Sequence, residues 1–163
     1  MVDAGCGTGR LLPALRAWGV NTVIGVDPSE GMLEQARRVH PEGTWLPGSL
    51  ERLPLGDSGA AGLLGWYSMI HLEVGELRAA AAEAFRVLAP GAPLLWGFHC
   101  PEADVPSRHM AADGRPVVLR ALSVPGVAAC LQEAGLELLA SGLRPARPQE
   151  RSAQGMVLAR KPR

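Results

Sequence analysis

The first ten residues place the strongest constraint on how this chain can fold. Val2, Asp3 and Ala4 read as the end of a strand, and glycines then stand at positions 5, 7 and 9. Glycine has no Cβ, so a loop built from three of them can turn sharply and bring its backbone close to a ligand. An apolar helical pattern follows, and the first N–H groups of a helix are free to face whatever binds there. The stretch therefore predicts a strand, a ligand-binding glycine loop and a helix.

Strand and helix patterns alternate through the rest of the chain. Short apolar runs typical of buried strands cover residues 22–26, 44–46, 60–68 and 93–98. Helical spacing of apolar residues covers residues 11–18, 28–39, 76–88 and 123–134. A final pair of strands is predicted at residues 136–143 and 154–159. Because no linker divides the sequence, we expect one domain over residues 1–163, an α/β sandwich around a largely parallel sheet.

Several local expectations accompany these elements. Pro13 is tolerable only in the first turn of its helix, and Ser123 is expected to cap the last helix. Trp96 and Phe98 on the fifth strand are expected in the core. The polar segment 100–116 contains proline and glycine and is predicted to be a loop. The spacing of four apolar residues predicts that Met32, Leu33, Ala36 and Val39 lie on one face of the second helix.

Composition excludes several classes of protein. The chain has 163 residues, 47% of them apolar, and a formal net charge of +0, which is typical of a globular domain and not of a dedicated nucleic-acid binder. No apolar run reaches the roughly 18 residues that span a membrane, and no signal peptide is visible. Cys6, Cys100 and Cys130 are far apart and odd in number, so we expect no disulfide framework and a cytoplasmic location.

An acidic residue strengthens the prediction of a nucleotide-type site. Asp27 ends the second predicted strand, where the acid of a βαβ site, about 20 residues after the glycine loop, accepts hydrogen bonds from ribose hydroxyls. A helix N-cap is the alternative role for Asp27. A dinucleotide site needs G-x-G-x-x-G, but Arg10 stands where the last glycine would be, and no lysine completes a P-loop. The spacing here is D-x-G-x-G-x-G, so a dinucleotide-dependent oxidoreductase is disfavoured.

With these motifs in order, the chain resembles the class I S-adenosylmethionine-dependent methyltransferases of small molecules. The resemblance is carried by VDAGCGTG at residues 2–9, VIGVDPSEGML at 23–33, GSLERLP at 48–54 and FRVLAPG at 85–91. It implies a Rossmann-like, doubly wound, mostly parallel sheet with helices on both faces and an antiparallel last strand. It also implies S-adenosylmethionine as cofactor and methyl transfer to a small-molecule acceptor, with no nucleic-acid or membrane partner. Such transfer is mainly a matter of alignment, and orientation alone can lower a barrier by about 7–11 kcal/mol.

The resemblance assigns expected roles to individual residues. The glycine loop would hold the methionine end of the cofactor, and other residues would hold the ribose and adenine. Carried over in this way, the cofactor-binding residues are Asp3, Gly5, Cys6, Gly7, Gly9, Asp27, Met32, Ser49, Leu50 and Trp66. Two positions depart from the family pattern, because many members carry Asp where Ser49 stands and glycine where Ala92 stands.

The sequence does not identify a catalytic residue, but it offers two candidates. Tyr67 and His71 come after the fourth predicted strand, in the region that faces the acceptor in the resembled fold, and histidine titrates near neutral pH. Cys6 is interpreted as a small residue beside the ligand and not as a reactive thiol. The spacing of His99, Cys100 and His109 matches no tight ligand set, so no metal site is predicted.

The start of the chain leaves a second hypothesis open. Only Met1 and Val2 precede Asp3, whereas a strand usually needs about 5–6 residues. We therefore expect the first strand and the helix that precedes it in the resembled family to be largely missing, as in an N-terminally truncated chain. The alternative function is then a non-catalytic remnant that binds the cofactor weakly or not at all.

Overall fold

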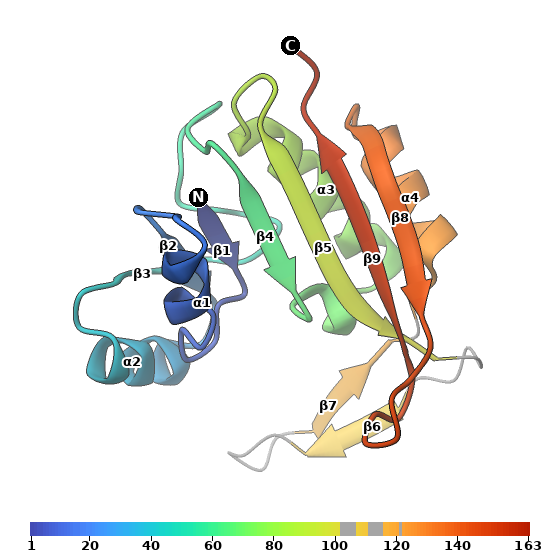
Figure 1. Cartoon of the computed structure of the whole chain (residues 1–163), viewed down its shortest axis with the longest axis horizontal. Coiled ribbons are helices and arrows are strands. Elements are labelled where there is room, and N and C mark those ends of the chain that lie inside the picture. The colour runs from blue at the N-terminus through green and yellow to red at the C-terminus, as the bar shows by residue number, and fades with distance from the viewer. Residues whose placement is uncertain (102–106, 111–115, 121) are drawn as a thin grey trace.

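The computed structural model describes residues 1–101, 107–110, 116–120 and 122–163. A seven-stranded sheet runs through the molecule, and a separate pair of strands lies beyond one of its edges (Figure 1). The strands of the large sheet are β1 (Val2–Ala4), β2 (Ile24–Asp27), β3 (Thr44–Pro47), β4 (Leu63–Trp66), β5 (Pro93–Cys100), β8 (Glu137–Arg144) and β9 (Ala153–Arg160).

The order of the strands is β3-β2-β1-β4-β5-β9-β8, with β9 antiparallel to both of its neighbours and the other pairs parallel. This confirms the predicted doubly wound, mostly parallel sheet with antiparallel strands at the end of the chain. The chain runs outward from β1 to β3 and then returns to the other side of β1 at β4. Ligands of open α/β sheets bind at such a switch point, outside the carboxyl ends of the strands.

Strand β1 is short but fully paired. Its three residues pair with β2 on one side, and Val2 and Asp3 pair with β4 on the other. The backbone of Met1 extends this pairing, because its carbonyl accepts a hydrogen bond from the N–H of Ile24 at 3.0 Å. The N–H of Val2 donates to the carbonyl of Gly62 at 2.9 Å. The glycine loop is therefore anchored to a strand that is held from both sides.

Helices cover both faces of the sheet, as predicted. Helices α1 (Leu12–Ala17) and α2 (Glu30–Val39) lie on one face, and α3 (Val74–Val87) and α4 (Val124–Glu133) lie on the other (Figure 1). A short 3₁₀ helix, η1 (Met69–His71), precedes α3. None of the helices in the described part of the chain is long and apolar enough to cross a membrane.

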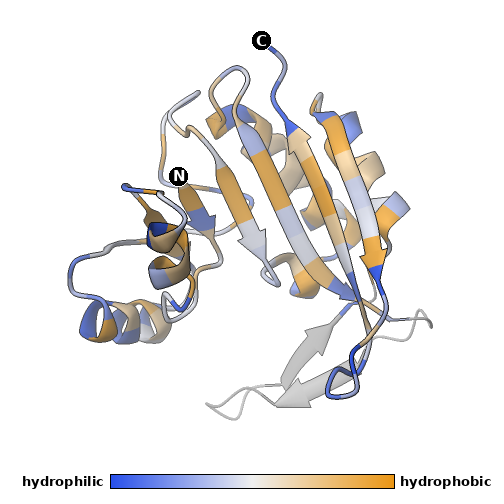
Figure 2. Cartoon of the chain, viewed as in Figure 1, coloured by the Kyte–Doolittle hydropathy of each residue, from blue (hydrophilic) through white to orange (hydrophobic). Residues whose placement is uncertain are grey.

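The alternation of side chains along the strands gives the sheet two hydrophobic cores. The major core lies beneath α3 and α4 and includes the strand residues Val2, Ala4, Val26, Leu63, Leu94, Trp96, Phe98 and Val157. The minor core lies beneath α1 and α2 and consists of Cys6, Leu12, Leu15, Val23, Leu33, Ala36, Trp45 and Leu64. Trp96 and Phe98 are fully buried, which confirms them as core residues. Figure 2 shows the apolar colour along the central strands and the polar colour on the outer sides of the helices.

The helix boundaries follow the expected local chemistry. Pro13 lies at the start of α1, where a proline N–H is not needed. The hydroxyl of Ser123 accepts a hydrogen bond from the N–H of Gly126 and caps α4. On the predicted face of α2, Leu33 and Ala36 are buried, whereas the side chains of Met32 and Val39 are 43% and 56% exposed. Helix α2 lies against β2 and the edge strand β3.

The prediction of a loop over residues 100–116 was also wrong in part. Strand β6 (Ser107–Met110) pairs antiparallel with β7 (Pro116–Leu119), and the two form the separate sheet (Figure 1). The N–H of Arg120, directly after β7, donates to the carbonyl of Ile70 in η1 at 2.7 Å. Polar residues of β6 gave no apolar alternation, which is the signal that identifies a strand from sequence.

Candidate functional site

The glycine loop has the geometry that its composition predicts. Gly5, Gly7 and Gly9 have positive φ angles of +76°, +54° and +76°, a conformation that side-chain-bearing residues rarely adopt. The N–H groups of Gly5 and Cys6 both donate to the carbonyl of Val26, at 2.7 and 3.0 Å. These bonds join the loop to the end of β2, so the carboxyl ends of β1 and β2 form one rigid edge.

The three glycines differ in what a Cβ at each position would contact. A Cβ on Gly5 would lie 2.1 Å from the Cβ of Ser68, and a Cβ on Gly9 would lie 2.4 Å from the ring of Trp45. A Cβ on Gly7 would meet nothing within 4 Å. Gly5 and Gly9 are therefore required by the packing of the protein itself, whereas Gly7 leaves open space for a ligand. All three remain predicted cofactor contacts through their backbone.

Trp45 is a supporting residue that sequence reasoning missed. Its ring occupies the space next to three glycines, because a Cβ on Gly9, Gly25 or Gly43 would lie within 2.4 Å of it. The indole N–H donates to the carbonyl of His40 at 3.0 Å, which fixes the ring from β3. Because these glycines are dispersed along the chain, no local motif could have indicated their common neighbour.

Asp27 connects the glycine loop to the second helix. One carboxylate oxygen accepts a hydrogen bond from the N–H of Gly7 at 2.9 Å, and the other accepts from the N–H of Ser29 at 2.9 Å. Ser29 is the N-cap of α2, so the alternative role of Asp27 as a helix cap is wrong. Each carboxylate oxygen can accept more than one hydrogen bond, so Asp27 keeps capacity for ligand hydroxyls. The ribose contact itself stays a prediction.

Asp3 is a buried acid below the loop. Only 2% of it is exposed, and no described group donates a hydrogen bond to its carboxylate. The pKa of Asp3 is raised to about 6, mainly by burial; the positive charge of Arg10 opposes this shift, and the negative charge of Asp27 adds to it. A buried carboxylate without a hydrogen-bond donor is costly to ionise, which agrees with the raised pKa of Asp3.

Cys6 lies inside the minor core, with 6% of it exposed. Burial raises the pKa of its thiol to about 12, and the negative charges of Asp3 and Asp27 act in the same direction. The thiol is therefore protonated at neutral pH, and the reactive form of a cysteine is the thiolate. This agrees with the interpretation that Cys6 is not a reactive thiol, and its position beside a ligand stays a prediction.

The three residues predicted near adenine lie in different environments. Met32 is 43% exposed on the first turns of α2, where its side chain can contact a ligand. Ser49 forms a tight turn with Arg52 through two backbone hydrogen bonds of 3.2 Å. The side chain of Leu50 is buried in the major core, so only the backbone of Leu50 can line a ligand site.

An ion-pair cluster that the sequence motif did not reveal holds the loop after β3. The carboxylate of Glu83 on α3 accepts a hydrogen bond from the N–H of Leu53 at 2.7 Å. Arg86, one turn later, donates to Glu83, to Asp57 and to the carbonyl of Leu55. The hydrogen bond from Arg86 holds the pKa of Glu83 below its usual range. Helix α3 thus fixes the loop that contains Ser49 and Leu50.

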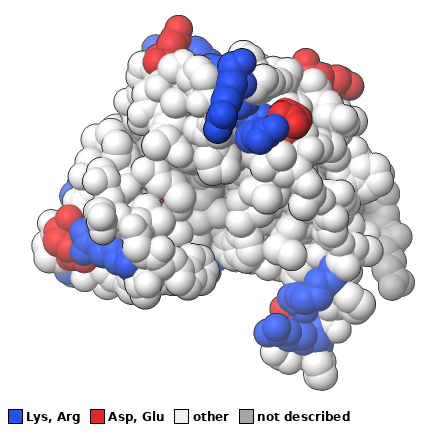
Figure 3. Space-filling model, turned by 45° about the horizontal axis from the view of Figure 1, so that its top comes forward, with Lys and Arg blue, Asp and Glu red and all other residues white. Residues whose placement is uncertain are grey.

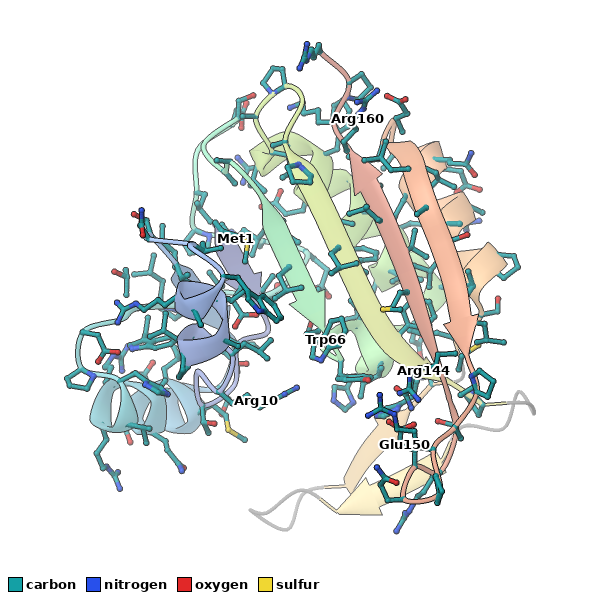
Figure 4. The ribbon with its side chains drawn as sticks, viewed as in Figure 1. Met1, Arg10, Trp66, Arg144, Glu150 and Arg160 are labelled. Carbon is teal, nitrogen blue, oxygen red and sulfur yellow. The ribbon has the colours of Figure 1, made fainter. Side chains whose placement is uncertain are left out.

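Aromatic and polar side chains gather at the carboxyl ends of β4 and β5. The rings of Trp66 and Tyr67 meet edge to face with centroids 5.3 Å apart, and the Tyr67 ring stacks on His99 at 4.5 Å. The Tyr67 hydroxyl donates to the buried Gln154 at 2.7 Å. Figure 4 shows Trp66 at the end of β4, with Arg10 and Arg144 near the same edge of the sheet.

The two candidate catalytic residues occupy different positions. Tyr67 has a positive φ of 60° and is held by its N–H, which donates to the carbonyl of Gly97 at 2.8 Å. Burial and the negative charge of Glu150 raise the pKa of Tyr67, so its hydroxyl stays protonated and acts as a donor. His71 is exposed at the end of η1. The catalytic roles of Tyr67 and His71 stay predictions.

Of the residues considered for a metal site, His99 and Cys100 have described side chains. Among the described residues there is no group of three or more His, Cys, Asp or Glu side chains that could hold a metal ion. His99 stacks on Tyr67, and its pKa is lowered by burial although a hydrogen bond with Gln154 opposes the shift. The side chain of His109 lies outside the part of the chain that the structure describes.

Comparison with known proteins identifies the motif-bearing part of the chain. The family model described as a methyltransferase domain matches residues 1–91. A malonyl-acyl-carrier-protein O-methyltransferase of Erwinia billingiae is 36% identical over 96 residues, which cover 59% of this chain and 37% of that protein. The enzyme of the same name from Yersinia pestis is 33% identical over 96 residues, covering 59% and 35%. The chain thus spans little more than a third of the length of these curated relatives.

Solved structures share the fold over almost the whole chain. An S-adenosylmethionine-dependent methyltransferase from Methanosarcina mazei has a TM-score of 0.85 and 15% identity, and covers 99% of this chain and 91% of its own. One from Mesorhizobium loti has a TM-score of 0.78, 21% identity and coverage of 98% and 90%. The cyclase SpnF also has a TM-score of 0.78, with 21% identity and coverage of 99% and 74%.

Proposed function

This chain belongs to the methyltransferase-domain family, and from that premise we propose that it binds S-adenosylmethionine and transfers a methyl group to a small-molecule acceptor. The binding site is the carboxyl edge formed by the ends of β1, β2 and β4, and residues 1–163 act as one domain. The observation that carries the proposal is the glycine loop, in which Gly7 faces open space while its N–H is fixed on Asp27.

The residues at this edge fit the proposed cofactor in their chemistry. The loop supplies close backbone approach at Gly7, and Asp27 supplies carboxylate oxygens for ribose hydroxyls. Met32 supplies an exposed, adaptable apolar surface for a base, and the buried Asp3 lacks a hydrogen-bond donor beneath the loop. The site thus offers contacts for a ribose, a base and a charged end within one edge of the sheet.

When bound, the cofactor supplies an electrophilic methyl group on a sulfonium. The work of this chain is then to orient the methyl donor and the acceptor, which can contribute about 7–11 kcal/mol to catalysis. Rigid elements are present for this purpose. Trp45 supports the glycine loop, Arg86 holds the loop after β3, and the stacked pair of Tyr67 and His99 forms a wall at the ends of β4 and β5.

The distribution of charge favours a small acceptor over a nucleic acid. The formal net charge is +0, and Figure 3 shows the charged side chains of one face in separate groups with uncharged surface between them. A nucleic-acid partner would call for a continuous basic surface. The curated relatives act on malonyl groups carried by a carrier protein, as their name states, and a small acyl group of that kind is within the proposed acceptor class.

Isothermal titration calorimetry with S-adenosylmethionine, S-adenosylhomocysteine and NADH tests the binding step. We expect micromolar dissociation constants for the first two, and a loss of at least tenfold in affinity for Asp27→Asn. Glu34→Gln, which removes an exposed acid on α2, is the matched control and should bind like the wild type. Binding of NADH alone would overturn the proposal in favour of an oxidoreductase.

Absence of binding to any of the three ligands would support the non-catalytic remnant instead. Because a cyclase shares the fold, binding has to be followed by a test of transfer. Incubation with methyl-labelled S-adenosylmethionine and a panel of small carboxylic acids, phenols and amines should place label in at least one acceptor. Tight cofactor binding with no labelled product across the panel would count against methyl transfer.

A further inference from the structure

The two edges of the large sheet differ in how well they are protected against further pairing. Strand β3, at one edge, has only four residues and ends at Pro47, which has no N–H to donate to another strand. Strand β8, at the other edge, has eight residues, and the six between its ends, LLASGL at residues 138–143, include no proline and no charge. Among the described residues, β8 pairs with β9 alone (Figure 1). A long uncharged edge strand offers a row of backbone groups that can pair with another chain.

Large apolar side chains are exposed along the same edge. Leu139 and Leu143 on β8 are 46% and 59% exposed, and Met156 on the neighbouring β9 is 38% exposed. Figure 2 shows mainly apolar and neutral colours along β8 and β9 between their ends. The charged residues of β8 are Glu137 and Arg144, one at each end of the strand. An exposed apolar patch with a polar rim is typical of a surface that contacts another protein.

The two charged ends of β8 lie on one face of the sheet. Glu137 stands opposite Arg160 of β9, and Arg144 stands opposite Gln154. Residues 160 and 154 are an even number of positions apart, so they face the same side, and cross-strand partners share a face. A regular strand would put residues 137 and 144 on opposite faces, and the register shift near the start of β8 brings them to the same one. The edge therefore presents a negative and a positive end on one side.

This arrangement of charges is complementary to itself. We propose that β8 pairs antiparallel with β8 of a second copy of the chain, about a twofold axis at Ser141, so that the two sheets become one. Each Glu137 then stands opposite Arg144 of the other copy, on one face of the joined sheet. Leu138 stands opposite Leu143 of the other copy, on the opposite face. Such an interface is isologous, because both copies use the same surface.

The ion pairs at the ends of β8 favour this antiparallel register. Arg160 donates two hydrogen bonds of 2.9 Å to Glu137, and Arg144 donates two, of 2.9 and 2.8 Å, to Glu150. Across the proposed interface the two pairs follow one another, so that charges alternate in sign along the row. A parallel pairing of the two strands would instead put like charges opposite each other at both ends, which is unfavourable.

The proposal predicts a dimer in solution. In sedimentation velocity at micromolar concentration, the wild type should form a species with twice the 17.2 kDa mass of the chain. Leu143→Lys puts a charge against Leu138 of the second copy and should raise the Kd of the dimer at least tenfold. Val39→Lys replaces an apolar residue of α2 that is 56% exposed, close to the 59% of Leu143. It is the matched control and should leave the Kd of the dimer unchanged.

A charge at the twofold axis gives the sharpest test, because a residue there faces its own copy. Ser141→Lys and Ser141→Glu should each raise the Kd of the dimer at least tenfold, since like charges would stand directly opposite each other. An equimolar mixture of the two variants should form the dimer again, because opposite charges then meet at the axis. A general weakening of the fold by either substitution would not produce this rescue.

Four results would overturn the proposal. They are a wild type that stays at 17.2 kDa up to its solubility limit, a dimer that the β8 variants leave intact, loss of the dimer in Val39→Lys, and no rescue in the mixture. Circular dichroism checks the fold of each variant. If a Ser141 variant does not fold, Leu143→Lys against Val39→Lys decides the question. These measurements need no cofactor, so their outcome is independent of the proposed methyl transfer.

Discussion

The two faces of the sheet are built for different tasks. The major core beneath α3 and α4 contains 26 buried residues among those described, whereas the minor core beneath α1 and α2 contains eight. Several of the proposed ligand residues belong to the minor side: Cys6 lies in the minor core and Trp66 packs against it, whereas the side chain of Leu50 lies in the major core. Burial on the major side therefore supplies most of the stability. The minor side can include polar groups and unfilled space at little cost to the fold.

Along β1 the division is visible from one residue to the next. Val2 and Ala4 point into the major core, and Asp3 between them points to the minor side. A buried acid at a central strand opposes folding, because its ionised form loses hydration without gaining a donor. The minor side can include such a residue only because the major core offsets its cost. Three predictions test this division, in order of expected effect.

The largest loss is expected from truncation in the major core. Phe98 is fully buried on β5 and fills the space beside Gly155. Phe98→Ala should lower the free energy of unfolding by about 3–5 kcal/mol through lost burial and a remaining cavity. Leu15→Ala, in the minor core, should cost about 2 kcal/mol. Urea denaturation followed by circular dichroism measures both, and equal losses would contradict the division into a major and a minor core.

Removal of the buried charge should stabilise the protein. The pKa of Asp3 is raised from 3.8 to about 6, so the folded state binds the proton more tightly than the unfolded state does. The free energy of unfolding therefore falls as the pH rises from about 4 to about 6, because Asp3 ionises first in the unfolded state. Above about pH 6 the protein bears the full cost of burying the ionised carboxylate. At about 1.4 kcal/mol per pKa unit, Asp3→Asn should raise the free energy of unfolding by about 2–3 kcal/mol at pH 8.

Urea denaturation at pH 8 and at pH 4 measures this effect, which should be near zero at the lower pH. Asp3→Asn should also bind S-adenosylhomocysteine more weakly than the wild type, because the amino group of the ligand would lose the carboxylate of Asp3 as a partner. A variant that is stabilised and keeps full affinity would show that Asp3 does not face the ligand. A variant that is destabilised at pH 8 would show that the carboxylate has a stabilising partner.

Much of the fold could be predicted from the sequence because it depends on local patterns. The apolar runs of β1 to β5 and the helical spacing of α3 and α4 lie within a few residues of each element. The pair β6 and β7 was missed because β6 lacks apolar alternation and β7 is an apolar run of only four residues. The sequence placed Met32 and Val39 on one face of α2 with the buried Leu33, but how much of that face is covered depends on the sheet beneath the helix.

The candidate site was predicted less completely because its support comes from distant residues. The glycines and Asp27 follow a motif with fixed spacing, so the sequence identified them together. The contacts of Gly5 with Ser68 and of Gly9 with Trp45 join residues far apart in the chain, and only the fold brings them together. The same holds for Glu83 and its bond to Leu53. Motifs therefore identify which backbone approaches a ligand, but not which side chains hold that backbone in place.

The smallest effect on stability is expected at the glycine that faces open space. Gly7 has a φ of +54°, so Gly7→Ala should cost about 1 kcal/mol of backbone strain, and its Cβ would meet no protein atom within 4 Å. Gly5→Ala carries the same strain, and in addition its Cβ would lie 2.1 Å from that of Ser68, so it should lose about 1–3 kcal/mol more. Urea denaturation measures the loss of stability in both variants.

Gly7→Ala, which should cost little stability, should have a large effect on ligand binding. Because the Cβ of Gly7→Ala would stand in the space proposed for the cofactor, the variant should fold almost normally yet bind S-adenosylhomocysteine at least tenfold more weakly. This combination is what a site on the minor side requires, since a residue there can be decisive for binding while contributing little to the core. Unchanged affinity in a well-folded Gly7→Ala would place the ligand elsewhere and would leave the open space at Gly7 without a role.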